Sequence, residues 1–171
     1  TIISGTKKPK VDIIKRCKYI YWPTLKTKFK PFEWLKLLVN TKLVEKVINR
    51  ADVVYITSHT LLPLALITKS LKPSIKVIIH LHNYQPLTYT SVLLNSTSFI
   101  NSDIIVERYE HNSIARALAI GALKPLNRVN TLALDYADII ICASRRQMEI
   151  ISNHLPKVRS KIKVIYNPLP N

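Results

Sequence analysis

The chain has 171 residues, of which 47% are hydrophobic, 26 are Lys or Arg and 10 are Asp or Glu. This length and apolar content predict one folded domain with a hydrophobic core and exclude a disordered chain. The two glycines, Gly5 and Gly121, cannot form the glycine-rich loops of dinucleotide-binding or P-loop proteins. The two cysteines form no C-x-x-C pair, which favours a reducing, cytoplasmic compartment.

The formal net charge is +16. Residues 1–50 contribute +10 of it, because this segment contains thirteen Lys or Arg and only three acidic residues. A positive field of this size attracts polyanions or anionic membrane surfaces. A solvated basic surface without a specific partner is the simpler interpretation. The longest uncharged stretch, residues 77–102, contains histidine, asparagine, glutamine and proline, so the sequence predicts a soluble domain without a transmembrane segment.

In the first fifty residues, short β-branched or aromatic runs predict strands at residues 1–4 and 19–22. Residues 32–49 have helical composition, but their apolar side chains gather on two nearly opposite faces. We therefore expect either two helical pieces that break near Asn40, or one helix held between two surfaces. The face that carries Val44 and Ile48 directly precedes the next strand and is expected to cover the sheet.

Four apolar runs follow, at residues 53–57, 76–81, 139–143 and 163–166, and they predict strands buried on both faces. Helices are expected between them, at residues 61–71, 105–120, 126–136 and 145–154. Ser58 or Thr60 is expected to cap the first of these helices and Ser144 the last, while Gly121 and Pro125 mark a break. The pattern predicts an α/β fold, a Rossmann-like three-layer domain with a mostly parallel sheet.

Each of the four predicted strands is followed by polar residues, and ligands of open α/β sheets bind just beyond the carboxyl ends of the strands. These candidate site residues are Ser58, His59, His82, Asn83, Ser144, Arg145 and Asn167.

His80 and His82 point to the same side of their predicted strand, so they could hold a metal ion. A third ligand is not evident, and we predict no metal site. His80 is expected to pack in the sheet region, whereas His82 is expected to face a ligand. A hydrolase triad is rejected, because the sequence has no G-x-S-x-G turn.

A cluster of basic and aromatic residues lies near residue 30. Such clusters occur at membrane interfaces and also stack on single-stranded nucleic acid. Alternatively, Phe32 and Trp34 face the protein core. The residues predicted to contact a membrane are Lys26, Lys28, Phe29, Lys30, Phe32 and Trp34.

Four sequence blocks resemble, in the same order, those of group 1 glycosyltransferases: ADVVYITSH (51–59), KVIIHLHNYQP (76–86), YADIIICASRRQMEII (136–151) and KIKVIYNPLPN (161–171). The resemblance implies one half of a GT-B fold. Residues 1–165 would be the N-terminal, acceptor-binding domain without its first strand and helix, and residues 166–171 the start of the interdomain linker. The donor-binding domain would lie outside this segment, which alone is expected to be inactive.

The resemblance also implies a retaining transfer, of the hexosyltransferase type, from a nucleotide-sugar co-substrate to a glycan or glycolipid acceptor, with no metal or other cofactor. His82 would be the catalytic residue and would hydrogen-bond the transferred sugar, and the other six candidate site residues would bind substrate. The expected location is cytoplasmic, with peripheral attachment to the inner face of the cell membrane. The alternative is a basic α/β module that binds anionic membrane or, as the less favoured partner, nucleic acid without catalysis.

Overall fold

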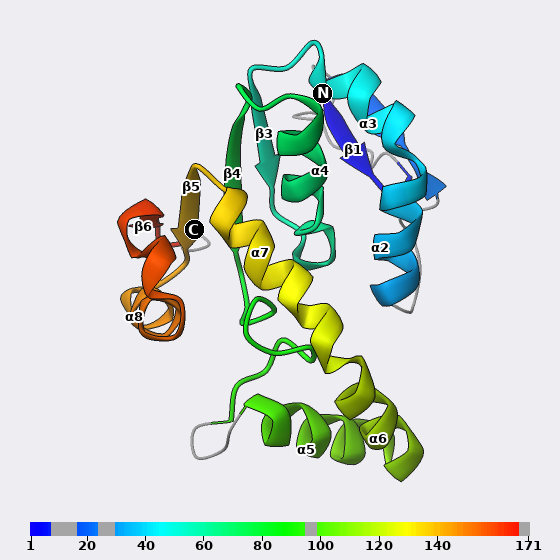
Figure 1. Cartoon of the computed structure of the whole chain (residues 1–171), viewed down its shortest axis with the longest axis vertical. Coiled ribbons are helices and arrows are strands. Elements are labelled where there is room, and N and C mark those ends of the chain that lie inside the picture. Colours follow the sequence, from blue (N-terminus) through cyan, green and yellow to red (C-terminus); the bar gives the residue numbers. More distant parts are fainter. Residues whose placement is uncertain (8–16, 24–29, 95–98, 168–171) are drawn as a thin grey trace, which may run out of the picture.

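The computed structural model describes residues 1–7, 17–23, 30–94 and 99–167, and it shows an α/β protein with two parallel sheets (Figure 1). In the smaller sheet, β1 (Ile2–Ser4) pairs with β2 (Tyr19–Tyr21). The larger sheet has the order β3-β4-β5-β6, and all its neighbouring strands are parallel. Its strands are β3 (Val53–Ile56), β4 (Lys76–Leu81), β5 (Ile139–Cys142) and β6 (Ile162–Val164). The predicted mostly parallel α/β sheet is confirmed.

Helices α4 (Leu64–Leu71), α7 (Arg128–Tyr136) and α8 (Arg145–His154) pack on one face of the larger sheet. Alternate strand residues point to these helices and form the main core with them. The strand side of this core consists of Ile56, Val77, Ile79, Leu81, Ile140, Cys142 and Ile162. Of the three predicted layers, the described residues therefore supply the sheet and the helical layer on this face.

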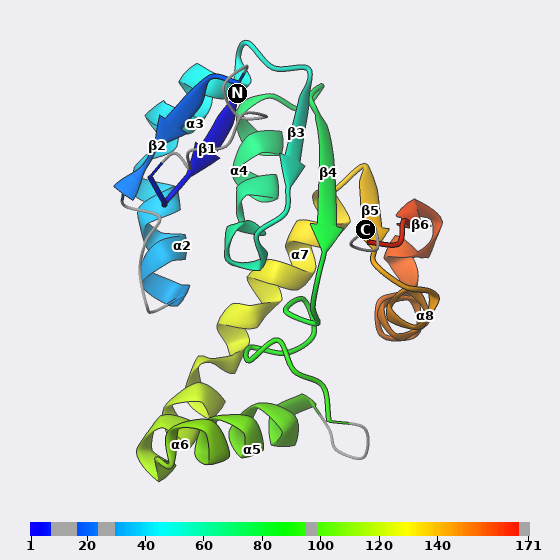
Figure 2. The ribbon, with the colours of Figure 1, turned by 180° about the vertical axis from the view of Figure 1, so that it is seen from behind.

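The opposite face of the larger sheet is less covered. Figure 2 views the sheet from this side, and no helix crosses in front of β3 and β4. The side chains of Val53, Tyr55 and Ile139 lie on this face and are 49%, 52% and 38% exposed. Buried parallel sheets normally have both faces covered, so this face is incomplete in the described part of the chain.

The predicted break in the helical region before β3 is confirmed. Helix α2 (Lys30–Val39) and helix α3 (Thr41–Ile48) meet at Asn40, whose side-chain amide donates a hydrogen bond to the carbonyl oxygen of Lys36 at 2.8 Å. Val44 and Ile48 of α3 join the main core, as their face was predicted to do. Because the break redirects the chain, α2 and α3 bury separate apolar faces.

The predicted break between two helices at Gly121 and Pro125 is confirmed near Pro125, because α6 (Ile114–Leu123) ends before it and α7 begins after it. The single helix predicted over residues 105–120 is wrong, because the chain turns between α5 (Phe99–His111) and α6, where Asn112 has φ 47°. Asparagine tolerates this left-handed conformation better than most residues. Gly121 lies inside α6, and a 3-10 helix, η3 (Lys124–Asn127), then joins α6 to α7.

Helices α5 and α6 form a hairpin beyond the carboxyl ends of the strands (Figure 1). Asp103 of α5 ties this hairpin to the loop after β4, because its carboxylate accepts hydrogen bonds from the amides of Tyr89 at 3.0 Å and Thr90 at 2.8 Å. Throughout the described part of the chain, no helix has both the length and the apolar character that crossing a bilayer requires.

Candidate functional site

The seven candidate site residues follow the carboxyl ends of four parallel strands. They therefore lie at the same end of the larger sheet, the end at which all four strands terminate. His82 and Asn83 follow β4, and Ser144 and Arg145 follow the adjacent β5. Ser58 and His59 follow β3 on one side, and Asn167 comes after β6 on the other. The exposed members are His82, Arg145 and Asn167, whereas Ser58, His59, Asn83 and Ser144 are half-buried.

Gln147 joins the loops that follow β4 and β5. Its side-chain Oε1 accepts a hydrogen bond from the amide of Ala143 at 2.8 Å, and its Nε2 donates to the carbonyl oxygen of Asn83 at 3.1 Å. Its own amide donates to Ser144 Oγ at 3.1 Å, which is the predicted cap of α8. Gln147 is only 5% exposed. One buried side chain therefore fixes the spacing of two candidate site loops.

Sequence reasoning missed Gln147, although a signal for it exists. Ser144 and Gln147 have the S-x-x-Q spacing of a capping box. In the usual capping box the glutamine side chain returns to the amide of the cap residue. Here it reaches the amide of the preceding residue, Ala143, and then contacts a loop 64 positions away in sequence.

The loop that carries His82 and Asn83 is held by hydrogen bonds of its own. Asn83 Oδ1 accepts from the amide of Gln85 at 3.0 Å, and Ser91 Oγ donates to Gln85 Oε1 at 2.5 Å. Thr131 of α7 donates to the carbonyl oxygen of Pro86 at 2.9 Å. Gln85 is completely buried. These bonds give the loop a defined conformation, which is what a binding site needs if its polar groups are to be oriented before a ligand arrives.

His80 and His82 differ in their surroundings although their rings lie close together, with centroids 4.2 Å apart. His80 Nδ1 shares a hydrogen bond of 2.6 Å with the hydroxyl group of Tyr55. Its Nε2 is buried and has no hydrogen-bond partner among the described residues. Burial lowers the pKa of His80, and the nearby His82 lowers it further. The lowered pKa favours the neutral form of the His80 ring, which lies beside the exposed His82.

The two histidines do not form a metal site with other described residues. In the described ranges, side chains of His, Cys, Asp and Glu nowhere gather in groups of three or more that could hold a metal ion. The hydroxyl group of Tyr55 and the ring of His82, neither of which adds a third ligand beyond the two histidines, lie against His80. His82 remains the member of the pair that faces solvent.

The loop after β3 is bound to α2. Thr60 Oγ1 donates a hydrogen bond to Glu33 Oε1 at 3.0 Å and lies 3.0 Å from Ser58 Oγ. Sequence reasoning did not single out Glu33, which is only 4% exposed. The prediction that Ser58 or Thr60 caps the following helix is wrong, because α4 begins after Pro63 without a side-chain cap. The hydroxyl groups bond one another and α2 instead.

Trp34 also belongs to this connection, and the predicted membrane contact is wrong for this residue. Its side chain is 5% exposed, packs with Tyr89 and Ile120, and donates a hydrogen bond from Nε1 to the carbonyl oxygen of Thr60 at 3.0 Å. The other residues of the predicted contact lie outside the part of the chain described at side-chain level: Lys26, Lys28, Phe29, Lys30 and Phe32. For these the contact stays a prediction.

The sequence matches neither a protein-family model nor a curated protein. The ligand chemistry of the loops at the carboxyl end of the sheet therefore follows from the residues in those loops. The exposed groups are an imidazole, a guanidinium and an amide, which can hydrogen-bond hydroxyl groups and, through Arg145, pair with phosphate. Polyhydroxylated, phosphate-bearing molecules are the ligand class that suits this combination.

Proposed function

We propose that this chain is the acceptor-side domain of a retaining glycosyltransferase of GT-B architecture. The observation that carries the proposal is the placement of His82 and Asn83 beside Ser144 and Arg145, at the carboxyl ends of the adjacent parallel strands β4 and β5. The motif blocks of the group 1 glycosyltransferase resemblance contain these strands and the residues that follow them. The reaction transfers a sugar from a nucleotide-sugar to a glycan or glycolipid acceptor.

In this proposal His82 hydrogen-bonds the transferred sugar, and Arg145 pairs with a phosphate group of the donor. The bond between the sugar and the phosphate oxygen breaks while the acceptor hydroxyl attacks from the same face of the sugar. The proton of that hydroxyl passes to the departing phosphate oxygen, so no general base from the protein is needed. Gln147 is a positioning residue, because it holds the loops of His82 and Arg145 at a fixed separation.

The test uses the protein expressed from its complete reading frame, with a panel of nucleotide-sugars and mixed glycan and glycolipid acceptors. We expect release of nucleoside diphosphate together with a glycosylated product. His82→Ala should lower kcat about 10²–10³-fold, the usual cost of removing one hydrogen bond to the transition state. His154→Ala is the matched control, because His154 is exposed on α8 and hydrogen-bonds the carbonyl oxygen of Ile150 in its own helix.

The proposal fails if no nucleotide-sugar is turned over, or if His82→Ala and His154→Ala have the same effect on kcat.

The net charge of +16 favours a second candidate, a basic module that binds nucleic acid or anionic membrane without catalysis. For this candidate the same preparation would bind mixed-sequence DNA or anionic vesicles, with an affinity that falls steeply as salt rises, and would transfer no sugar.

A further inference from the structure

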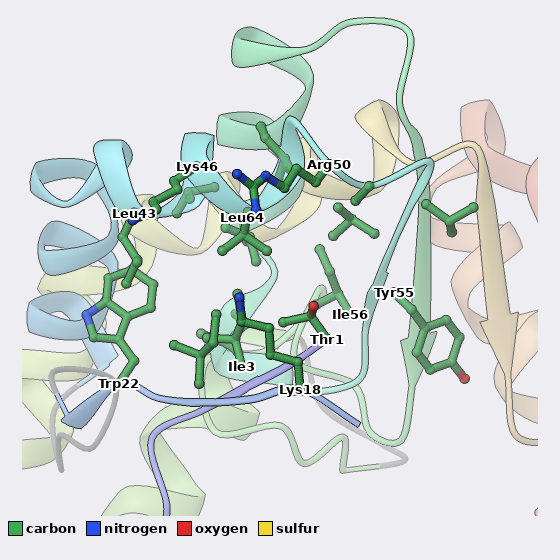
Figure 3. Close-up of a pocket in the computed structure, with 18 of the residues that line it drawn as sticks. Thr1, Ile3, Lys18, Trp22, Leu43, Lys46, Arg50, Tyr55, Ile56 and Leu64 are labelled. Atoms are coloured by element: carbon green, nitrogen blue, oxygen red, sulfur yellow. The ribbon is translucent and has the colours of Figure 1, made fainter. Parts of the chain in front are cut away.

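A cavity of about 620 Å³ lies between the smaller and the larger sheet (Figure 3). In Figure 2 the strands follow one another as β2, β1, β3, β4, so the cavity occupies the space between β1 and β3. Helices α3 and α4 cover it from the face that also carries α7. The apolar part of its lining includes Ile3, Trp22, Val44, Val54, Ile56 and Leu64.

On the side of the cavity, the main chain of β1 has no hydrogen-bond partner among the described residues. The amide of Ile2 donates to the carbonyl oxygen of Lys18 at 2.8 Å, and the amide of Trp22 donates to that of Ser4 at 2.8 Å. Main-chain groups of successive residues in a strand point to opposite neighbours. Residues 2 and 4 therefore face β2, and the amide and carbonyl groups of Ile3 point to the cavity.

The same alternation applies to β3. The amide of Lys76 donates to the carbonyl oxygen of Asp52 at 3.1 Å, so Asp52, Val54 and Ile56 face β4. The amide and carbonyl groups of Val53 and Tyr55 then point to the cavity. Both β1 and β3 are parallel to their own partners, and their arrows run the same way in Figure 2. The cavity thus lies between two parallel strands whose main-chain groups on this side have no partner in the described ranges.

An extended polypeptide segment has the shape and chemistry that this space requires. One strand, placed about 4.8 Å from each neighbour, would pair with Ile3 on one side and with Val53 and Tyr55 on the other. Its alternate side chains would meet Val44 and Leu64 beneath it. The two sheets would then become one continuous parallel sheet in the order β2-β1-strand-β3-β4-β5-β6.

The handedness of the connections indicates where such a strand comes from. From β2 to β6 the chain winds in one direction across the sheet, and its connecting helices lie on one face. A strand in the cavity followed by β1 would wind in the opposite direction. Because such crossovers are right-handed in nearly all proteins, its connecting helix would lie on the opposite face. That is the face on which Val53, Tyr55 and Ile139 are 49%, 52% and 38% exposed.

We infer that the cavity between β1 and β3 is the seat of a parallel β-strand, and that this strand and a crossover helix are supplied by polypeptide that precedes Thr1 in the full-length protein. The strand of one β-α unit at this position would fill the cavity and hydrogen-bond to both β1 and β3. Its helix would cover the sheet face that carries the exposed side chains of Val53, Tyr55 and Ile139. Thr1, which directly precedes β1, is itself part of the cavity lining. The inference rests on the sheets and does not depend on sugar transfer.

The test is amide hydrogen exchange, resolved by residue, in the full-length protein and in a form that begins at Thr1. In the full-length protein we expect the amides of Ile3, Val53 and Tyr55 to exchange as slowly as those of Val54 and Ile56, which bond to β4. In the shorter form the first three should exchange at least 100-fold faster, while slow exchange of Val54 and Ile56 shows that the sheet is still folded.

Fast exchange of Ile3 and Tyr55 in the full-length protein would overturn the inference. So would protection that disappears on dilution, because the occupant would then be a second copy of the chain. Ile3→Trp provides a second measurement, since Ile3 lines the cavity (Figure 3) and a larger side chain there would crowd the side chain of an added strand on the same face of the sheet. We expect it to lower the urea midpoint of the full-length protein, where the strand fills the space, and to leave that of the shorter form unchanged or raised. Equal effects in both forms would also contradict the inference.

Discussion

The surroundings of His80 lead to a pH-dependent property of one residue. Burial lowers its pKa from the ordinary value of 6.5, and His82 lowers it further. The folded protein thus binds this proton more weakly than the unfolded chain does. As pH falls from 6.5 through the folded-state pKa of His80, the unfolded state gains more from protonation, and the free energy of unfolding decreases.

We expect His82→Ala to raise the pKa of His80, because it removes the repulsion between two imidazolium groups, but not to restore it to 6.5, because burial remains. The measurement is an NMR titration of the His80 ring, with urea unfolding at pH 5 and 7.5 as the linked stability measurement. Tyr55→Phe is an informative comparison, since it removes the 2.6 Å hydrogen bond and leaves His82 in place. A His80 titration midpoint at or above 6.5 in the unmodified protein would contradict this account.

Single residues also show what local sequence can and cannot predict. Ser144 was predicted as a cap because its hydrogen-bond partner is three residues away, and the bond to Gln147 confirms it. Asp138 was not recognised, because its partners are distant. Its carboxylate accepts from the amide of Val77, 61 positions away, and pairs with Lys69 at 2.8 Å. Burial raises the pKa of Asp138, but the bonds from Lys69 and Val77 outweigh burial and hold it below the ordinary value.

At the scale of the helices, the sequence predicted the breaks at Asn40 and near Pro125 but missed the turn at Asn112. The break at Asn40 could be predicted, because opposite apolar faces cannot both pack on one sheet. The turn at Asn112 could not, because glycine and proline were taken as the markers of helix ends. Glycine inside a helix costs only about 1 kcal/mol relative to alanine, and packing of α5 against α6 outweighs that cost at Gly121.

This packing predicts opposite effects for two alanine substitutions in the same hairpin. Gly121→Ala should stabilise the protein by about 0.4–1 kcal/mol, because the helical conformation is already present and the unfolded chain loses freedom. A β-carbon at Gly121 would lie 3.8 Å from Ile104 Cδ1, an ordinary van der Waals contact. Asn112→Ala should destabilise by about 1–2 kcal/mol, because φ is 47° there.

Urea unfolding of both variants and of Asn112→Gly measures these differences. Glycine at residue 112 should be tolerated better than alanine, which separates the backbone cost from loss of the asparagine side chain. A destabilised Gly121→Ala variant would show that α5 and α6 pack more closely than their contact at Ile104 indicates.

At the scale of the whole molecule, the four apolar runs predicted the parallel pairing of β3 to β6 and the common edge of their polar ends. Those features depend on strand composition and on the alternation of side chains between the two faces of a strand, and both can be read directly from a sequence. The separation of β1 and β2 into a second sheet could not be predicted in the same way. It depends on which strand neighbours which, and three-residue strands contain too few positions to specify a partner.

The last prediction concerns the charge of the whole chain. Because 26 basic residues face 10 acidic ones, at least sixteen basic side chains have no acidic partner in one-to-one pairing. At about 10 mM salt the Debye length is roughly 30 Å, so these charges repel one another across the molecule, whereas at 0.15 M it is about 8 Å. Self-repulsion of this kind destabilises the compact state.

We therefore expect Tm to rise as NaCl increases from about 10 mM to 0.15 M. A gain of about 1 kcal/mol would correspond to roughly 2–4 °C for a chain of this size. The double variant Lys157→Gln with Lys163→Gln, which removes two exposed charges, should have a higher Tm at low salt and a smaller response. Sucrose at equal osmolarity is the uncharged control. A Tm that stays constant or falls with NaCl would show that the basic side chains do not repel one another in the folded protein, and that bound anions already neutralise them.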